Sequence, residues 1–394
     1  MLTKWTLCAL VVLFAAACAP GEPIVGGEPQ DVTDVFVAEP AGVEVTSWVE
    51  GLEVPWSLVF AGNGRALVSE RGGRIRLIMD GSLHEEPYAE IDVAAVGEGG
   101  LMGLALHPEF PGEPYVYAMY TYREAGNLFN RVVRLTDKGE SGEFDRVIID
   151  DIPGGRVHDG GRIAFGPDGY LYVCTGEIWQ PHLSQDLDSL AGKMLRLTAD
   201  GEIPAGNPFE DSTVYSYGHR NPQGIAWHPE TGELFSSEHG PSGELGGLRG
   251  KDEINVIRKG ANYGWPDVVG APGVEGYVDP IIMWTTATPP GGIAFYDGDL
   301  FVATLRSEAL IRITFGDNGE GHSIARIERW FADGAASGRY GRLRDVVVGP
   351  DGALYVLTSN RDGRGTPRDG DDRILRITIE ADAAGAPGEA NGGQ

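Results

Sequence analysis

The sequence predicts an all-β protein, namely a six-bladed β-propeller with four-stranded blades. Glycine and proline account for 59 and 25 of the 394 residues, which favours many tight turns. Segments with helical periodicity are nearly absent. A unit of two short apolar strands around a glycine-containing turn recurs six times. Six such units are best closed as blades around an axis, because closure protects the edges of the sheets.

Each copy of the repeat begins with an apolar triplet, passes through the turn and continues into a second apolar strand. Successive copies begin 46 to 68 residues apart, which leaves room for about four strands of about 5 to 6 residues in each. One segment, residues 183–195, is either a short helix or an irregular loop. The six first strands begin at Leu58, Leu104, Ile163, Ile225, Ile293 and Val346.

The first 18 residues predict a signal peptide. Lys4 is followed by an apolar stretch of 11 residues from Leu7 to Ala17, which is too short to span a membrane. The small residues before Cys18 form a cleavage site and also resemble a bacterial lipobox. We therefore expect an exported protein of the periplasm or cell envelope, anchored to the membrane only through a lipidated Cys18; plain secretion is the alternative.

The remainder divides into a folded body and two tails. Residues 19–42 are rich in Pro, Gly, Glu and Asp, which predicts a flexible tether, and residues 381–394 predict a disordered tail. Residues 43–380 form the expected propeller domain. Cys174 is the one cysteine of this body and lies in an apolar strand, so a buried, inert thiol is expected.

The charge of the chain excludes one class of partner. Lys and Arg number 31 against 58 Asp and Glu, a net charge of −27, which repels nucleic-acid phosphates and anionic membrane surfaces. No nucleic-acid function is expected.

Polar residues cluster at one phase of the repeat. If the glycine turn closes one end of each hairpin, the residues before the first strand and after the second meet at the other end, near the axis. Planar guanidinium groups bind carboxylates bidentately, so arginines gathered there predict a site for a compact polyanion. The alternative is that they form ion pairs between blades. These arginines are Arg162, Arg220, Arg306, Arg342 and Arg344.

His158 is the best candidate for a general base, because imidazole titrates near the working pH. Gly160 and Gly161 follow it and are expected to let a ligand approach closely. The alternative is a histidine that is hydrogen-bonded within a loop. Neither the H-E-x-x-H zinc motif nor the G-x-S-x-G elbow occurs in the sequence.

Loops after the fourth copy are rich in carboxylate and carbonyl oxygens, which suit a hard cation such as calcium. They comprise residues 238–241, 252–255 and 262–266.

These motifs together resemble the soluble pyrroloquinoline-quinone-dependent glucose and aldose sugar dehydrogenases, a family of calcium-containing six-bladed propellers. The likeness runs from about Val54 to Thr358, most of the body. It rests on an ordered set of motifs: Gly99-Gly100-Leu101 with His107-Pro108, His158 to Arg162, Tyr217 to Gln223, Glu238 to Pro241, Asp252 to Asn255, Asn262 to Pro266, and Arg342 to Val346.

The resemblance implies oxidation of the C1 hydroxyl of a sugar to a lactone, with hydride transfer to the quinone. In that chemistry His158 takes the hydroxyl proton, Glu177 orients His158, and Arg220 polarises the carbonyl oxygen on which negative charge develops. The cofactor's carboxylates are implied to bind Asn221, Arg306, Arg342 and Arg344. Glu98 stands where the glucose enzymes have a cofactor-contacting Gln, and Arg306 stands where a Lys is familiar.

The resemblance also implies two calcium sites. The backbone carbonyls of Gly240 and Pro241 match the active-site calcium, and Glu253 with the carbonyl of Tyr263 matches a second, structural one. The loop Ser242–Gly250 between these motifs is longer than in the aldose enzymes. Electrons are expected to pass to an external acceptor such as a quinone, a dye or a small redox protein.

Two other functions remain as alternatives. One is a metal-dependent lactonase, which needs carboxylate and Asn ligands converging at the axis. The other is a propeller that binds a ligand without catalysis.

Overall fold

The computed structural model describes residues 22–27, 29–30, 32–316 and 322–380. Within these residues the chain forms strands and one short 3₁₀ helix, η1 (Pro181–Ser184). No helix in this part of the chain is long and apolar enough to cross a membrane. The predicted signal peptide at 1–18 and the predicted tail at 381–394 lie outside the described residues.

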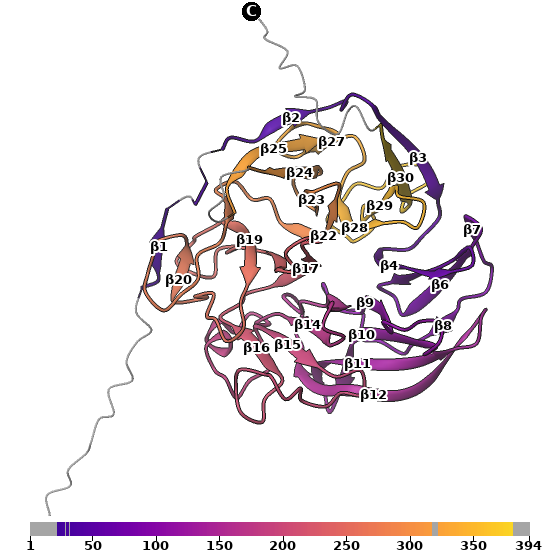
Figure 1. Ribbon diagram of the computed structural model, residues 1–394, viewed down its shortest axis with the longest axis horizontal. Coiled ribbons are helices and arrows are strands. Elements are labelled where there is room, and N and C mark those ends of the chain that lie inside the picture. Colours follow the sequence, from indigo (N-terminus) through magenta and orange to yellow (C-terminus); the bar gives the residue numbers. More distant parts are fainter. Residues whose placement is uncertain (1–21, 28, 31, 317–321, 381–394) are drawn as a thin grey trace, which may run out of the picture.

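Six antiparallel sheets surround a central axis, as the repeat predicts (Figure 1). The first three are β4 (Pro55–Gly62), β5 (Arg65–Glu70), β6 (Arg74–Met79), β7 (Ser82–Leu83) with β8 (Ala89–Glu90) beside β6; β9 (Leu101–Leu106), β10 (Tyr115–Glu124), β11 (Asn127–Asp137), β12 (Gly142–Pro153); and β13 (Ile163–Phe165), β14 (Leu171–Thr175), β15 (Lys193–Leu197), β16 (Val214–Tyr217).

The other three blades follow in chain order. They are β17 (Pro222–Trp227), β18 (Leu234–Glu238), β19 (Asp252–Ile257), β21 (Ile282–Trp284); β22 (Pro290–Tyr296), β23 (Asp299–Thr304), β24 (Leu310–Phe315), β25 (Ile324–Trp330); and β28 (Leu343–Val348), β29 (Leu354–Thr358), β30 (Ile374–Ile379), β3 (Val43–Val49). A short antiparallel pair, β26 (Ala332–Gly334) and β27 (Ser337–Gly338), lies in the connection between the last two blades.

The six predicted copies begin in six different blades, which confirms the six-bladed propeller, and their first strands are the inner strands of those blades. The inner strands β4, β9, β13, β17, β22 and β28 contact one another around the axis. The second strands are buried on both faces, because each blade packs between two neighbours; Val173, Val302 and Val356 are fully buried there. Of residues 183–195, the first two end the 3₁₀ helix η1, residues 185–192 form a loop, and the last three lie in β15.

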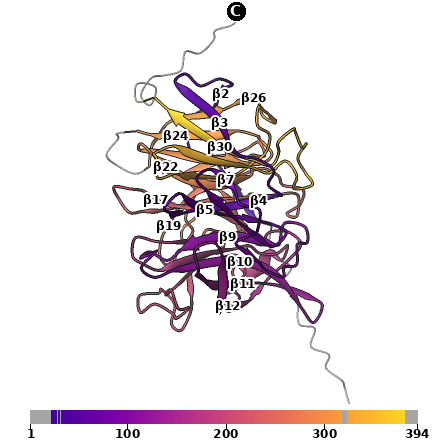
Figure 2. The same ribbon diagram turned by 90° about the vertical axis from the view of Figure 1, so that its right-hand side faces the viewer.

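The ring is closed by the two ends of the folded body. β3 from the N-terminal side pairs antiparallel with β30 from the C-terminal side, with Val43 opposite Ile379. The two strands lie side by side in both views (Figures 1 and 2). The last blade is therefore completed by the beginning of the body, which makes its folding depend on both ends of the chain.

Among residues 22–27, 29–30 and 32–42, which the structure describes, two strands pair with the propeller where the composition predicts a flexible tether. β1 (Ile24–Gly26) pairs in parallel with β20 (Val268–Gly270), and β2 (Val35–Val37) adds to β25 of the fifth blade. The β-branched and aromatic residues of these two strands favour an extended, paired backbone. These strands lay the segment along the outside of the propeller (Figure 1).

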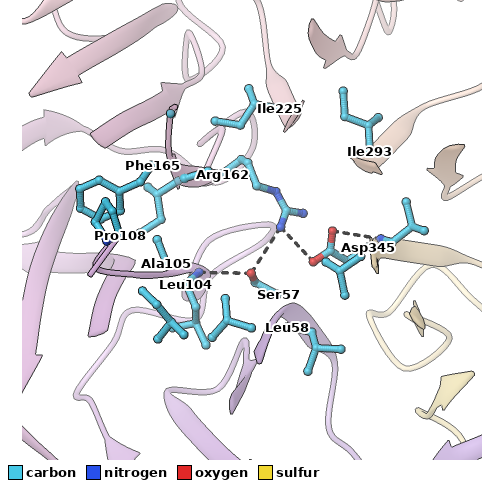
Figure 3. Close-up of a pocket in the computed structure, with 17 residues that line it drawn as sticks. Ser57, Leu58, Leu104, Ala105, Pro108, Arg162, Phe165, Ile225, Ile293 and Asp345 are labelled. Atoms are coloured by element: carbon cyan, nitrogen blue, oxygen red, sulfur yellow. Dashed lines mark hydrogen bonds and ion pairs between the residues drawn. The ribbon is translucent and has the colours of Figure 1, made fainter. Parts of the chain in front are cut away.

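Arg162 lies on the axis and joins four blades. Its Nη1 donates to Asp345 Oδ2 at 2.9 Å and to Ser57 Oγ at 3.3 Å (Figure 3). Its Nε donates to the Gln223 carbonyl at 3.0 Å. Its side chain also covers the Trp56 ring, 4.5 Å from the centroid. The arginine lines an axial cavity of about 400 Å³ whose other walls are largely aliphatic side chains of the inner strands.

Replacing Arg162 by Leu is expected to destabilise the propeller by about 3–5 kcal/mol, because the buried carboxylate of Asp345 loses its cationic partner. The two side chains are 8% and 2% exposed. Chemical denaturation of purified protein measures the change. An Arg376→Leu control removes the exposed pair with Asp351 and is expected to cost under about 1 kcal/mol. An equal loss of unfolding free energy in the two variants would show that the buried axial pair stabilises the propeller no more than an exposed pair does.

Candidate active site

A cavity of about 370 Å³ lies where loops of the second to sixth blades meet near the axis. The loops precede β9, β13 and β28 or follow β18, β23 and β29. Its walls carry both signs of charge and several backbone groups. The lining residues include Glu98, His158, His239, Gly240, Pro241, Ser242, Asp252, Arg306, Arg342 and Arg364.

His158 and Glu177 form a buried pair at this cavity. His158 Nδ1 is hydrogen-bonded to Glu177 Oε1, and both side chains are nearly inaccessible to water. An ionised carboxylate only accepts hydrogen bonds, so Nδ1 carries the proton and Nε2 is left with its lone pair. The pair therefore sets the tautomer that a general base needs.

The backbone of His158 is held in the left-handed region, with φ of 60°. Its N–H donates to Glu98 Oε2 at 3.0 Å, and Glu98 Oε1 pairs with Arg364 Nη1 at 2.6 Å. Burial alone would raise the pKa of Glu98, but Arg364 and this N–H lower it to about 2. Glu98 is thus a carboxylate that positions the loop of the histidine.

The two glycines after His158 are closely packed. Gly160 and Gly161 have φ of 69° and 104°. A Cβ on Gly160 would come within 2.4 Å of the Cys174 carbonyl, and one on Gly161 within 2.6 Å of Met102 Sδ. Close packing within the third blade and against the second therefore requires glycine at both positions. The approach of a ligand over them stays a prediction.

Arg220 is fixed by four groups around its guanidinium. Nη2 donates to His158 Nε2 at 3.0 Å and to Ser242 Oγ at 3.2 Å, and Nη1 donates to the His239 carbonyl at 3.2 Å. Nε pairs with Glu244 Oε1 at 2.5 Å. These contacts fix the position of the guanidinium beside His158 before any ligand binds.

Asn221 braces the loops behind the cavity. Its Oδ1 accepts from the Gly160 N–H at 3.0 Å, and its Nδ2 donates to His239 Nδ1 at 3.3 Å. Burial lowers the pKa of His239 to about 3, so its ring is neutral and donates through Nε2 to the Pro290 carbonyl at 2.8 Å. The structure thus ties the loop of the histidine base to the one after β18.

The arginines expected to hold a polyanion differ in their surroundings. Arg306 is exposed at the cavity wall, and Arg344 is buried with Nε unpartnered and only Gln223 Oε1 accepting from its Nη1, at 2.5 Å. Burial lowers the pKa of Arg344 to about 10. Arg342 lines the cavity and pairs with Asp362. The exposed guanidinium of Arg306 and the unpartnered Nε of Arg344 fit a ligand with several carboxylates. Arg162, by contrast, is committed to Asp345 on the axis, which is the ion-pair alternative.

The predicted calcium ligands lie on the fourth blade and the loops around it. Gly240 and Pro241 form part of the cavity wall. Glu253 lies opposite Glu238 on the adjacent strand, and burial together with the charge of Glu238 raises the pKa of Glu253 well above its usual range. Asn255 Oδ1, two residues on along the strand, is buried without a hydrogen-bond partner. Asn255 Nδ2 donates to Glu253 Oε2 at 3.3 Å. An unpartnered amide oxygen beside two facing carboxyl groups fits a hard cation.

Backbone oxygens would have to complete either calcium site. Among the residues that the structure describes, no three His, Cys, Asp or Glu side chains converge as a metal site. Tyr263 is buried, and its ring stacks on His219 with centroids 4.7 Å apart. Cys174 is buried and free, and burial raises the pKa of its thiol, as expected for an inert residue.

Sequence reasoning missed four residues around this cavity: Trp179, His239 as a brace, Glu244 and Arg364. His239 was seen only as part of a motif. Glu244 and Arg364 lie in loops whose conformation no periodic pattern specifies. Trp179 lies two residues after Glu177 in the sequence, and this closeness to a predicted catalytic residue is the signal that could have identified it.

The chain is similar to known proteins over most of its length. The family model described as Glucose / Sorbosone dehydrogenase matches residues 52–375. Aldose sugar dehydrogenase YliI of Escherichia coli is 34% identical over 359 residues, which cover 83% of this chain and 92% of that protein. Quinoprotein glucose dehydrogenase B of Acinetobacter calcoaceticus is 34% identical over 218 residues, 48% of this chain and 44% of that protein.

Solved structures give the same picture. A Thermus thermophilus protein described as an oxidoreductase (glucose dehydrogenase) is 55% identical, with a TM-score of 0.80, and the match covers 86% of this chain and 100% of that one. The pyrroloquinoline-quinone-bound form of aldose sugar dehydrogenase from Streptomyces coelicolor is 40% identical, with a TM-score of 0.75, covering 87% of this chain and 100% of that one.

Proposed function

Because the chain belongs to the glucose/sorbosone dehydrogenase family, we propose that it oxidises the C1 hydroxyl of an aldose sugar to the lactone with pyrroloquinoline quinone as cofactor. The single observation that carries this proposal is the His158–Glu177 pair, which presents an unprotonated Nε2 beside Arg220. The electrons then pass to an external acceptor, a quinone, a dye or a small redox protein.

When bound, pyrroloquinoline quinone supplies an electrophilic quinone carbon that accepts the hydride leaving C1 of the sugar. The chain's own part is proton transfer: His158 Nε2 accepts the proton of the C1 hydroxyl, and Glu177 stabilises the imidazolium that results. The cofactor's carboxylates would be held by Arg306, Arg342 and Arg344, with Asn221 bracing the loop. Glu98 supports this site through the backbone of His158 and does not donate to the cofactor.

Arg220 has a second task during this transfer. While Nε2 holds a lone pair, Arg220 Nη2 donates to it. An imidazole nitrogen has one lone pair, so the sugar hydroxyl takes the place of Arg220 at Nε2 before its proton is transferred, and the hydrogen bond from Arg220 is lost. That donor is then available to a neighbouring oxygen on which negative charge develops, in a site where few waters compete.

Calcium is the second proposed cofactor. The carbonyls of Gly240 and Pro241 would bind it at the cavity, and Glu253 with the carbonyl of Tyr263 would bind a structural ion behind the cavity. What supports this is the position of the Glu253 carboxyl opposite Glu238 on the adjacent strand, together with the orphaned Asn255 Oδ1.

Export is proposed from the sequence of residues 1–18. A basic residue, an 11-residue apolar stretch and small residues before Cys18 support a signal peptide with lipid attachment at that cysteine. The enzyme would then work in the periplasm or cell envelope.

Activity is expected only when both cofactors are added. The chain without residues 1–18 is purified free of metal and quinone, and dye reduction is followed with a panel of aldoses, with either, both or neither cofactor. Dependence on both supports the proposal, and the aldose oxidised fastest names the sugar.

Other outcomes of this assay are informative. Cofactor binding without oxidation of any aldose would contradict the sugar assignment and favour another alcohol substrate. Absence of cofactor binding would contradict the dehydrogenase assignment and return attention to the lactonase and the non-catalytic propeller.

A further inference from the structure

Trp179 is exposed directly beside the base. Its side chain is 49% exposed, and among the described residues it is the one tryptophan in the exposed class. Its ring lies 5.1 Å from that of His158, centroid to centroid, at an interplanar angle of 38°. A single exposed aromatic side chain is common on protein surfaces; what distinguishes Trp179 is its place directly beside the candidate base.

The backbone at this point adopts a conformation that side chains rarely accept. Ile178 and Trp179 have φ of 53° and 65°, so two consecutive residues other than glycine lie in the left-handed region. Such conformations cost energy, persist only when their surroundings enforce them, and cluster at ligand sites. Here they turn the chain so that the indole stands next to the imidazole.

Hydrogen bonds fasten this turn to the catalytic pair itself. Trp179 N–H donates to Glu177 Oε1 at 3.1 Å, the same oxygen that holds His158 Nδ1. Ile178 N–H donates to the His158 carbonyl at 3.2 Å, and Gln180 N–H donates to the Glu177 carbonyl at 2.8 Å. The position of the indole is therefore tied to that of the base.

The chemistry of this surface matches a sugar ring. A pyranose presents C–H groups on its faces and hydroxyls around its edge, so a face packs on an aromatic ring while the edge hydroxyls find polar partners. The indole offers the aromatic face, and His158 Nε2 offers an acceptor for one edge hydroxyl when that hydroxyl displaces Arg220 Nη2. A substrate of one ring can contact both groups at once.

We propose that Trp179 is the stacking platform for the substrate and that it selects aldoses in their pyranose form. This inference rests on the proposed function, because it uses His158 as the acceptor of the C1 hydroxyl. A stacking contact is made equally before and during the reaction, so its loss raises KM and leaves kcat nearly unchanged.

The test compares Trp179→Ala and Trp179→Phe with the unaltered chain. KM for aldoses is expected to rise about tenfold in the alanine variant and by a smaller factor in the phenylalanine variant, with kcat within about threefold. Affinity for pyrroloquinoline quinone stays the same. The matched control is Phe144→Ala on β12, which removes another exposed ring, 64% exposed, and is expected to change nothing.

A second measurement does not depend on turnover. 1,5-Anhydroglucitol is a pyranose without the C1 hydroxyl and cannot be oxidised there; its binding to each variant is measured by saturation-transfer NMR on the ring protons. We expect about tenfold weaker binding to Trp179→Ala.

The two measurements separate the two proposals. Trp179-dependent binding of the anhydrosugar without oxidation of any aldose supports the platform and contradicts the sugar oxidation. Unchanged KM and unchanged binding in Trp179→Ala overturn the platform and leave the oxidation standing. Absence of anhydrosugar binding to the unaltered chain overturns the platform as well.

Discussion

Replacing His158 by Ala is expected to lower sugar-dependent dye reduction by about 10²–10⁴-fold, the contribution of a positioned general base. The variant loses the proposed acceptor of the C1 proton. Burial lowers the pKa of His239, the other histidine that lines the cavity, to about 3, so its ring is a poor substitute. Cofactor binding is expected to remain, because the arginines that would hold the carboxylates are untouched.

Two measurements check this. The rate of dye reduction at saturating sugar and cofactor gives kcat, and titration of the protein with pyrroloquinoline quinone gives its affinity. His84→Ala, at a turn of the first blade where the ring contacts the Glu86 carbonyl, is the control and should keep full activity. Dye reduction that survives in His158→Ala would show that the base is another group.

The fold could be predicted because its signal is repeated. Six copies of one apolar hairpin indicate a closed ring, and the glycine turns indicate which ends of the hairpins share a side. No periodic pattern reports how the ring is closed, however. β3 pairs with β30 although they lie at opposite ends of the body, and β1 and β2 pair with the propeller from a segment whose composition indicates a tether.

The site could be predicted in part, for a reason that the arginines illustrate. Position along the repeat indicates the end of the propeller at which a residue lies, but the direction of its side chain depends on local backbone. Arg162 and Arg344 occupy the same phase of the repeat, and each has one buried nitrogen without a hydrogen-bond partner. Arg162 nevertheless pairs with the carboxylate of Asp345 on the axis, whereas Arg344 donates to the amide oxygen of Gln223.

The side-chain partners that could not be predicted from the sequence lie in loops. The negative charge of Glu98 is compensated by Arg364, which is 266 residues away in the sequence and donates to Glu98 Oε1. No pattern near Glu98 in the sequence indicates this partner. Glu244 is similar: its loop has no apolar pattern, and its carboxylate reaches Arg220 because the loop folds back, with a bridge between Ser242 and Arg249.

Arg220→Ala is expected to lower kcat by about 10²–10³-fold, the usual effect of removing one preorganised donor from a site where negative charge develops. Glu244, Ser242 and the His239 carbonyl hold the guanidinium before any substrate arrives, so little reorganisation is needed when charge appears. Steady-state kinetics with saturating cofactor measure kcat and KM separately.

Arg220→Lys distinguishes charge from geometry. Lysine keeps the positive charge but lacks the planar fork, so it cannot bond Glu244 through one nitrogen and the site through another. A variant that recovers less than about a tenth of the activity would place the effect in the fork, and one that recovers most of it would place the effect in the charge. A kcat for Arg220→Ala within about threefold of the unaltered chain would contradict both, since it would mean that no charge develops within reach of this guanidinium.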